Sequence, residues 1–166
     1  HRRPGRHAHQ RRHPVGLTMP SYLPPLDIGR PCLVEHLAFW RHCAQGELRF
    51  QRCEDCGARR HPPSPLCPMC RSVNSRWELA SGDAELFSYT VVHHAASAAL
   101  QHAVPYNIAI VAFPSLGMLR LVSNVIDAAP DQLRIGMALE LVWQRVDAGR
   151  QLPLFKRANH AEAEPA

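Results

Sequence analysis

The segment Cys53–Cys70, CEDCGARRHPPSPLCPMC, carries four cysteines spaced as C-x2-C-x10-C-x2-C. Each Cys-x-x-Cys pair can offer two thiolates to one tetrahedral ion, and ten residues between the pairs suffice for the chain to turn back. Gly57 follows the first pair, where the turn favours positive φ, and Pro68 lies inside the second, where a φ near −65° is needed. The pattern predicts a zinc ribbon that holds one zinc ion. Its four ligands are Cys53, Cys56, Cys67 and Cys70.

An all-cysteine shell leaves no open coordination position, so the predicted zinc is structural and not catalytic. Two disulfides or unrelated core thiols are the alternatives, and the paired spacing argues against both. His61 lies between the two pairs and is a further candidate ligand, but Pro62 and Pro63 follow it and favour a loop residue. Cys32 and Cys43 stand outside any pair and are expected to be buried apolar residues of a preceding helix.

The chain has 166 residues, of which 46% are hydrophobic, so it can bury one modest core beyond a ribbon of roughly 30 residues. A second module is therefore expected. No apolar run reaches the 18 or so residues of a membrane span, which predicts a protein without a membrane partner. Reduced cysteines favour the cytoplasm.

Positive charge is concentrated at the start of the chain. The formal net charge is +5, and five arginines with no acidic residue precede residue 18. The remaining 14 basic residues balance the 14 acidic ones, so the body has no general affinity for polyanions. Residues 1–18 are interpreted as a disordered extension, with Met19 as a plausible true start. A nucleic-acid-binding arm is the alternative.

The rest of the chain divides by pattern. Prolines in residues 20–31 predict an extended arm, apolar residues from Pro31 to about Ala44 recur at helical spacing, and Leu48 and Phe50 alternate as in a short strand. The predicted units are residues 19–46 for the proline-rich arm and amphipathic helix, 47–76 for the ribbon, 77–157 for a second domain and 158–166 for a disordered tail.

Alternating apolar residues after the ribbon predict five strands without a long helix between them, which is typical of a small closed or partly closed barrel. Phe87, Tyr89 and Val91 are expected on one face of the second strand. Leu119, Leu121 and Val125 are expected on one face of the fourth, and core packing is the simplest role for both sets. The predicted strands are Trp77–Ser81, Ala84–Val92, Asn107–Phe113, Met118–Ile126 and Ala138–Val146.

This order of modules resembles the zinc-ribbon/OB-fold acyl-CoA-associated proteins, which are small accessory partners of thiolase-fold enzymes. The resemblance covers about residues 32–157. The motifs that carry it are GELRFQRC at 46–53, the two cysteine pairs with Pro62 and Pro63 between them, Trp77 before Ser81-Gly82, FSYTVVH at 87–93, Pro105-Tyr106, Ile135-Gly136-Met137 and LPLF at 152–155. Two departures are Ala84, where the family tends to have a second glycine, and Leu116, where it tends to have an acidic residue.

The resemblance implies a mainly β fold with an N-terminal helix, a rubredoxin-like zinc ribbon and a five-stranded OB-like barrel. It also implies a non-catalytic subunit that docks on a thiolase-superfamily enzyme, either a thiolase or a retro-aldolase, in a hetero-oligomer and helps to hold or channel acyl-CoA. No catalytic residue is expected in this chain. The partner's surface and the barrel together would form the path of the acyl-CoA.

A long loop after the second barrel strand, HHAASAALQHAV at 93–104, is the predicted wall of that path. Its small residues would let a pantetheine arm approach, and its imidazoles can relay protons, donate to a thioester or phosphate oxygen, or simply be solvated. The expected acyl-CoA residues are His93, His94, Ala96, Ala98, His102 and Tyr106.

Two other functions compete with this reading. Zinc ribbons and OB barrels both occur in single-stranded nucleic-acid-binding proteins, but residues 77–114 contain no lysine or arginine to pair with phosphates. A stand-alone hydrolase or aldolase that uses His93 and His94 is the other alternative. The sequence has no nucleophile elbow, P-loop or GxGxxG motif to support an enzyme of its own.

Overall fold

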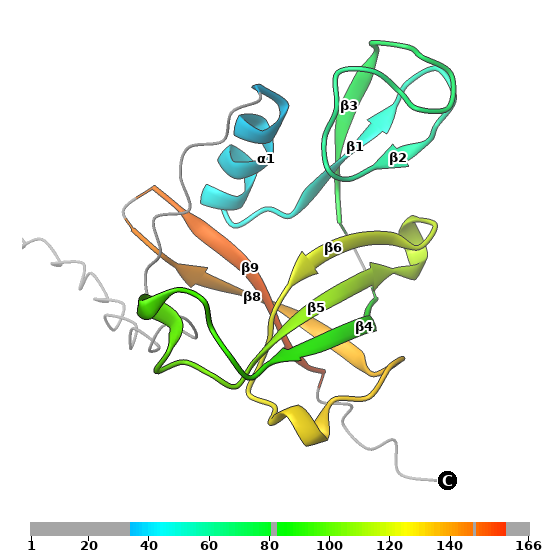
Figure 1. Cartoon of the computed structure of the whole chain (residues 1–166). Coiled ribbons are helices and arrows are strands. Elements are labelled where there is room, and N and C mark those ends of the chain that lie inside the picture. The colour runs from blue at the N-terminus through cyan, green and yellow to red at the C-terminus, as the bar shows by residue number, and fades with distance from the viewer. Residues whose placement is uncertain (1–33, 81–82, 148, 159–166) are drawn as a thin grey trace, which may run out of the picture.

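The computed structural model describes residues 34–80, 83–147 and 149–158. One helix, α1 (Val34–Ala44), precedes two sheets that lie one above the other in Figure 1. The first sheet has the order β2-β1-β3 and the second β6-β5-β4-β8-β9-β7. The strands of the first sheet are β1 (Arg49–Cys53), β2 (Arg59–Arg60) and β3 (Ser75–Leu79). Those of the second are β4 (Ala84–Val92), β5 (Tyr106–Phe113), β6 (Leu119–Ser123), β7 (Val125–Ile126), β8 (Ala138–Arg145) and β9 (Gln151–Arg157).

The helix ends where the sequence predicts. Gly46 has a φ of 74°, and its N–H donates to the Cys43 carbonyl at 2.9 Å while the Glu47 N–H donates to the His42 carbonyl at 3.0 Å. A glycine in this left-handed conformation satisfies the last carbonyls of a helix without steric cost. Phe39 and Cys43 are buried on the inner side of α1, so the helix covers the junction between the two sheets.

The second sheet is a curled OB-fold sheet and not a closed barrel. Its two outer strands, β6 and β7, follow each other in the chain with only Asn124 between them, while β5 pairs with β6 and β9 pairs in parallel with β7. The buried Asn107 side chain fixes this bend: its Nδ2 donates to the Val125 carbonyl at 2.7 Å, and its Oδ1 accepts the Val125 N–H at 2.8 Å. If β6 and β7 are counted as one bent strand, the sheet has the predicted five strands.

One predicted strand belongs to the other sheet, and one strand of the OB sheet was not predicted. The segment predicted as Trp77–Ser81 is β3, which pairs with β1 in the ribbon sheet and not with the OB sheet. Its place in the OB sheet is taken by β9, which the sequence reading treated only as a motif. Pro153 lies inside β9 and cannot donate to a ladder, and that is why the pattern did not predict a strand there.

A β-bulge in β4 overturns the predicted position of Phe87. Leu86 lies opposite Val111 and Ser88 opposite Ile110, so Phe87 is the extra residue that resets the alternation. Leu86 is therefore fully buried, whereas the Phe87 ring lies under the guanidinium of Arg120 at 3.7 Å. Of the other expected core residues, Tyr89 and Leu119 pack against the core, and Leu121 and Val125 are part of it. Val91 is half-buried.

The ribbon and the OB sheet share one hydrophobic core. Phe50 of β1 is 1% exposed and packs edge-on against Phe113 of β5 at 5.1 Å between ring centroids. Phe113 packs in turn against the fully buried Phe155 of β9 at 6.1 Å. This aromatic row joins the two sheets under α1.

Several predictions fall outside the described residues: the basic extension at 1–18, the arm at 20–31, Cys32 and the tail from residue 159. Within the parts that the structure describes, no helix is long and apolar enough to cross a membrane.

Candidate functional site

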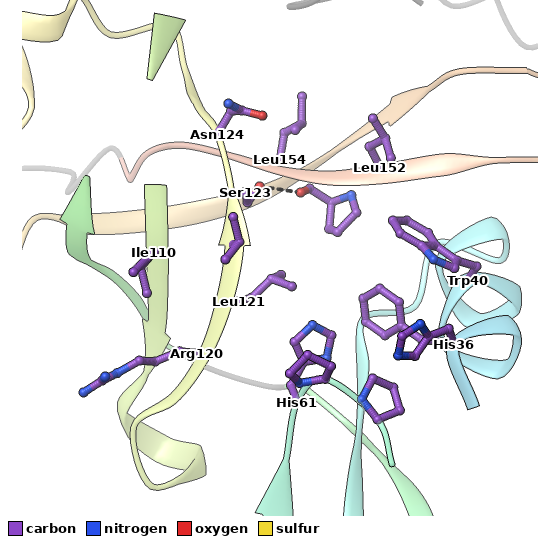
Figure 2. A pocket seen from close by; sticks show the side chains of 15 residues that line it. His36, Trp40, His61, Ile110, Arg120, Leu121, Ser123, Asn124, Leu152 and Leu154 are labelled. Carbon is purple, nitrogen blue, oxygen red and sulfur yellow. Dashed lines mark hydrogen bonds between the residues drawn. The ribbon is translucent and has the colours of Figure 1, made fainter. Parts of the chain in front are cut away.

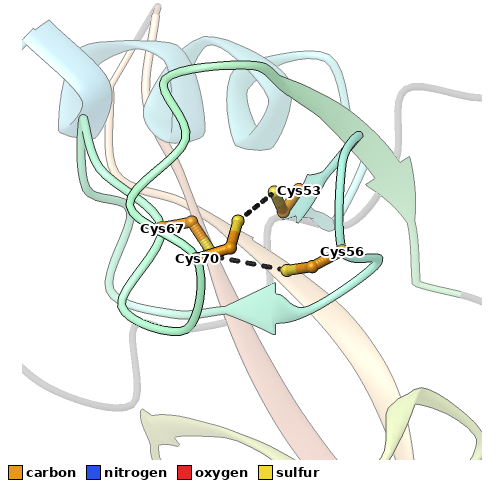
Figure 3. Close-up of side chains that lie close together, drawn as sticks. All are labelled: Cys53, Cys56, Cys67 and Cys70. Atoms are coloured by element: carbon orange, nitrogen blue, oxygen red, sulfur yellow. Dashed lines mark hydrogen bonds between the residues drawn. The ribbon is translucent and has the colours of Figure 1, made fainter.

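The two cysteine pairs form matching knuckles at one end of the ribbon (Figure 3). Gly57 has a φ of 74° and its N–H donates to the Cys53 carbonyl at 3.1 Å. Arg71 repeats this geometry after the second pair: it has a φ of 63°, and its N–H donates a hydrogen bond to the Cys67 carbonyl at 2.9 Å. The positive φ at Gly57 was predicted. The one at Arg71 was not, because an arginine gives no signal for it.

The four sulfur atoms are placed for one tetrahedral ion. All lie within 4.8 Å of one another, with 3.6 Å between the Sγ atoms of Cys53 and Cys70 and 3.5 Å between those of Cys56 and Cys67. Zinc–sulfur bonds near 2.3 Å in a tetrahedron require sulfur–sulfur distances of about 3.8 Å. Cys53 and Cys67 are buried while Cys56 and Cys70 are exposed, so the site lies at the surface of a small element. The residues fit a metal that is coordinated by four thiolates.

Backbone amides prepare the inner cysteines for that charge. The backbone N–H of Cys70 donates a hydrogen bond to the Cys67 sulfur, and that of Met69 does so with a smaller effect. Together they lower the pKa of the Cys67 thiol to about 6. The N–H of Cys56 has the same effect on Cys53, whose pKa is also lowered. Hydrogen bonds to the ionised form favour it, so the knuckles stabilise thiolates, the form that binds zinc.

His61 is not part of the sulfur cluster, and this agrees with the predicted loop role. Its ring packs against Phe39 at 4.9 Å and against Phe50 at 5.3 Å between centroids. Burial lowers the pKa of His61 to about 4. Cys43 is fully buried, as predicted, and burial raises its pKa to about 12. Neither group is available as an ordinary metal ligand.

The loop predicted to line an acyl-CoA path follows β4 and contains a short 3-10 turn, Ala98–Leu100. Ala95 is buried and anchors the loop, whereas Tyr106 is half-buried at the start of β5. The predicted contact residues His93, His94, Ala96, Ala98 and His102 are exposed. The structure brings them onto one surface loop.

A pocket that the sequence reading missed lies elsewhere (Figure 2). It has a volume of about 520 Å³ and is lined by α1, the ribbon segment 61–63 and strands β5, β6 and β9; we call it the α1–β9 pocket. Labelled residues from all of these elements, among them Trp40, His61, Leu121 and Leu152, surround the same space in Figure 2. The pocket arises only when the helix, ribbon and OB sheet meet, so no local sequence pattern could have revealed it.

Comparison with known proteins agrees with this architecture. Residues 40–74 match the family model of the ChsH2 rubredoxin-like zinc ribbon domain, and residues 77–144 match that of the ChsH2 C-terminal OB-fold domain. A zinc ribbon joined to an OB fold is thus the class of protein that the fold and the cysteine site define. A DUF35 domain-containing scaffold protein of Methanocaldococcus jannaschii is 32% identical over 109 residues, which are 64% of this chain and 75% of the relative. The chain belongs to this DUF35 family of ChsH2-like proteins.

Two further relatives place the family in larger proteins or complexes. A probable enoyl-CoA hydratase alpha subunit of Thermomonospora curvata is 38% identical over 130 residues, which are 78% of this chain but only 40% of the subunit. The chain therefore spans about two fifths of that relative. Among solved structures, a chain of the Ltp2-ChsH2(DUF35) aldolase matches with a TM-score of 0.69 and 35% identity, covering 77% of this chain and 98% of that one.

Proposed function

We propose that this chain is a non-catalytic zinc-ribbon/OB-fold subunit that docks on a thiolase-superfamily enzyme, a thiolase or a retro-aldolase, and helps to bind or channel acyl-CoA. The observation that carries the proposal is the match to almost the whole length of a chain of the Ltp2-ChsH2(DUF35) aldolase. A reduced four-thiolate site is compatible with the cytoplasm, where we place the complex. The metal that we propose for it is one structural zinc ion per chain.

The ribbon offers a surface suited to docking. Leu66, Met69 and Val73 lie on its loops with 47%, 76% and 69% of their surface exposed. Exposed apolar side chains that cluster on a small element often mark a protein interface. We propose that these residues contact the partner enzyme.

The loop after β4 remains our proposed wall of the acyl-CoA path. It is exposed, it consists mainly of small residues and it carries three imidazoles that can donate to a thioester or phosphate oxygen. A partner that covers this loop would convert it into one side of a channel. The proposed contact residues are His93, His94, Ala96, Ala98, His102 and Tyr106.

Single-stranded nucleic-acid binding is supported less well. Stacking platforms need exposed aromatic rings beside basic residues. In the described OB sheet, the ring of Phe87 is already covered by Arg120, and residues 77–114 contain no lysine or arginine that could track a phosphate backbone.

The test is affinity capture of the tagged full chain from its native cells, followed by mass spectrometry of what co-purifies. We expect a thiolase-fold protein in a fixed ratio to the chain. Val73→Asp should reduce its recovery at least tenfold, because a charge would be buried in the interface. Ile135→Asp is the matched control: Ile135 is 71% exposed, much like Val73, but belongs to the OB domain, and its variant should capture the partner normally. Equal recovery with both variants would contradict docking through the ribbon.

A further inference from the structure

The α1–β9 pocket has hydrocarbon walls. They come from the helix and from strands β6 and β9. The apolar residues that line it include Phe39, Trp40, Leu121, Val122, Leu152 and Leu154. A cavity of about 520 Å³ with such a lining has the size and character of a small-molecule site.

The polar groups at the pocket are mostly occupied by the protein itself. The Ser123 hydroxyl donates to the Pro153 carbonyl at 2.6 Å, and the Asn124 amide donates to the Asn107 carbonyl. Arg120 is the charged side chain of the lining, but its guanidinium stacks on Phe87 and extends away from the other labelled side chains in Figure 2. The permanently charged side chain of this lining is therefore directed away from the pocket.

His61 differs from Ser123 and Asn124, because its buried Nδ1 has no hydrogen-bond partner. Its Nδ1 is buried and unpaired, whereas Nε2 is not among the buried unpaired atoms of the described residues. Burial keeps the ring neutral at pH 7, with a pKa of about 4, so it carries a single N–H. A buried unpaired N–H is rarer in proteins than a buried lone pair, which places the proton on Nε2. The ring thus has one N–H donor to offer to a molecule in the pocket.

We infer that the α1–β9 pocket binds an uncharged, mainly hydrocarbon ligand whose carbonyl oxygen accepts a hydrogen bond from His61 Nε2. The inference is independent of the proposed function, because no residue of the loop at 93–104 lines this pocket. The hydrocarbon body would replace water along the walls, and the carbonyl would accept the hydrogen bond that His61 offers. A carboxylate or an ammonium group would have to be desolvated without a partner.

Three probes with one hydrocarbon cage test this chemistry on the metal-loaded full chain. They are 2-adamantanone, 2-methyleneadamantane, which has the same shape without the oxygen, and adamantane-1-carboxylate. Calorimetric titration should show the ketone bound at one site, about threefold to tenfold more tightly than the alkene, as one net hydrogen bond provides. The carboxylate should bind at least tenfold more weakly than the ketone. The ketone should also shift the Nε2 resonance of His61 in nitrogen-15 spectra of the histidine rings.

His61→Phe removes the donor and keeps a ring between Phe39 and Phe50. In this variant the ketone and the alkene should bind equally, while thermal unfolding shows a melting temperature no lower than that of the wild type. Arg120→Ala is the control at the rim and should leave the ratio of the two affinities unchanged. The inference is overturned if the wild type binds no ketone up to its solubility limit, binds ketone and alkene equally, or prefers the carboxylate. It is also overturned if the His61→Phe variant still prefers the ketone to the alkene.

Discussion

Phe50→Ala should destabilise the whole protein and not only the ribbon. Phe50 is 1% exposed, and its ring contacts both His61 of the ribbon loop and Phe113 of the OB sheet. Truncating a fully buried phenylalanine costs about 3–5 kcal/mol, because hydrocarbon contacts are lost and a cavity remains. The edge-on pair with Phe113 should account for about 0.5–1.5 kcal/mol of this.

Urea unfolding of the wild type, Phe50→Ala, Phe113→Ala and the double variant gives both quantities through a double-mutant cycle. Hydrogen exchange followed by mass spectrometry then shows where the protection is lost. We expect β1 and β5 to lose protection together, because they share one core. A loss below 1 kcal/mol, or a ribbon that opens while the OB sheet keeps its full protection, would refute the idea of a single cooperative core.

Three further predictions concern the metal, an ion pair and the loop. Cys67→Ser should abolish stoichiometric zinc binding, measured by elemental analysis. It should also lower the melting temperature, since metal binding contributes to folding of the ribbon. Unchanged zinc content would rule out the four-cysteine site. Arg59 lowers the pKa of Glu78 below its ordinary 4.5 through a 2.6 Å hydrogen bond, so Glu78 stabilises the fold above that pH and loses this contribution as the pH falls. The stability difference between wild type and Glu78→Gln in urea should accordingly shrink below pH 4.5, and a difference that is constant with pH would count against the pair. Replacing Ala96 and Ala98 by leucine should raise the apparent KM for acyl-CoA in the assembled complex with partner affinity unchanged, whereas unaltered kinetics would place the path elsewhere.

The features that the sequence could reveal were those encoded by local spacing. The cysteine pairs specify their own knuckles, and the alternation in Ala84–Val92 defines β4 with its observed ends. Gly46 likewise ends α1 because a left-handed residue is needed there. Each of these signals depends on a few neighbouring residues, so it can be recognised without tertiary structure.

The features that could not be predicted depend on contacts between distant segments. The bulge at Phe87 breaks the alternation of a strand whose sequence looks regular, and only pairing with β5 exposes it. Pro153 lies within β9 although it has no N–H, because the residues on both sides of it still pair with β8. The partly buried position of His61 follows from packing between α1 and β1, so its sequence context indicated only a loop.

We propose that this chain has no carbon–carbon bond-cleaving activity of its own and acts through a partner. The most direct test measures cleavage of a β-hydroxyacyl-CoA by the purified chain alone, by the partner recovered from native cells alone, and by the two recombined. We predict no turnover above background by the chain alone and full activity only when both proteins are present. Turnover by the highly purified chain alone that disappears in His93→Ala or His94→Ala would contradict the account.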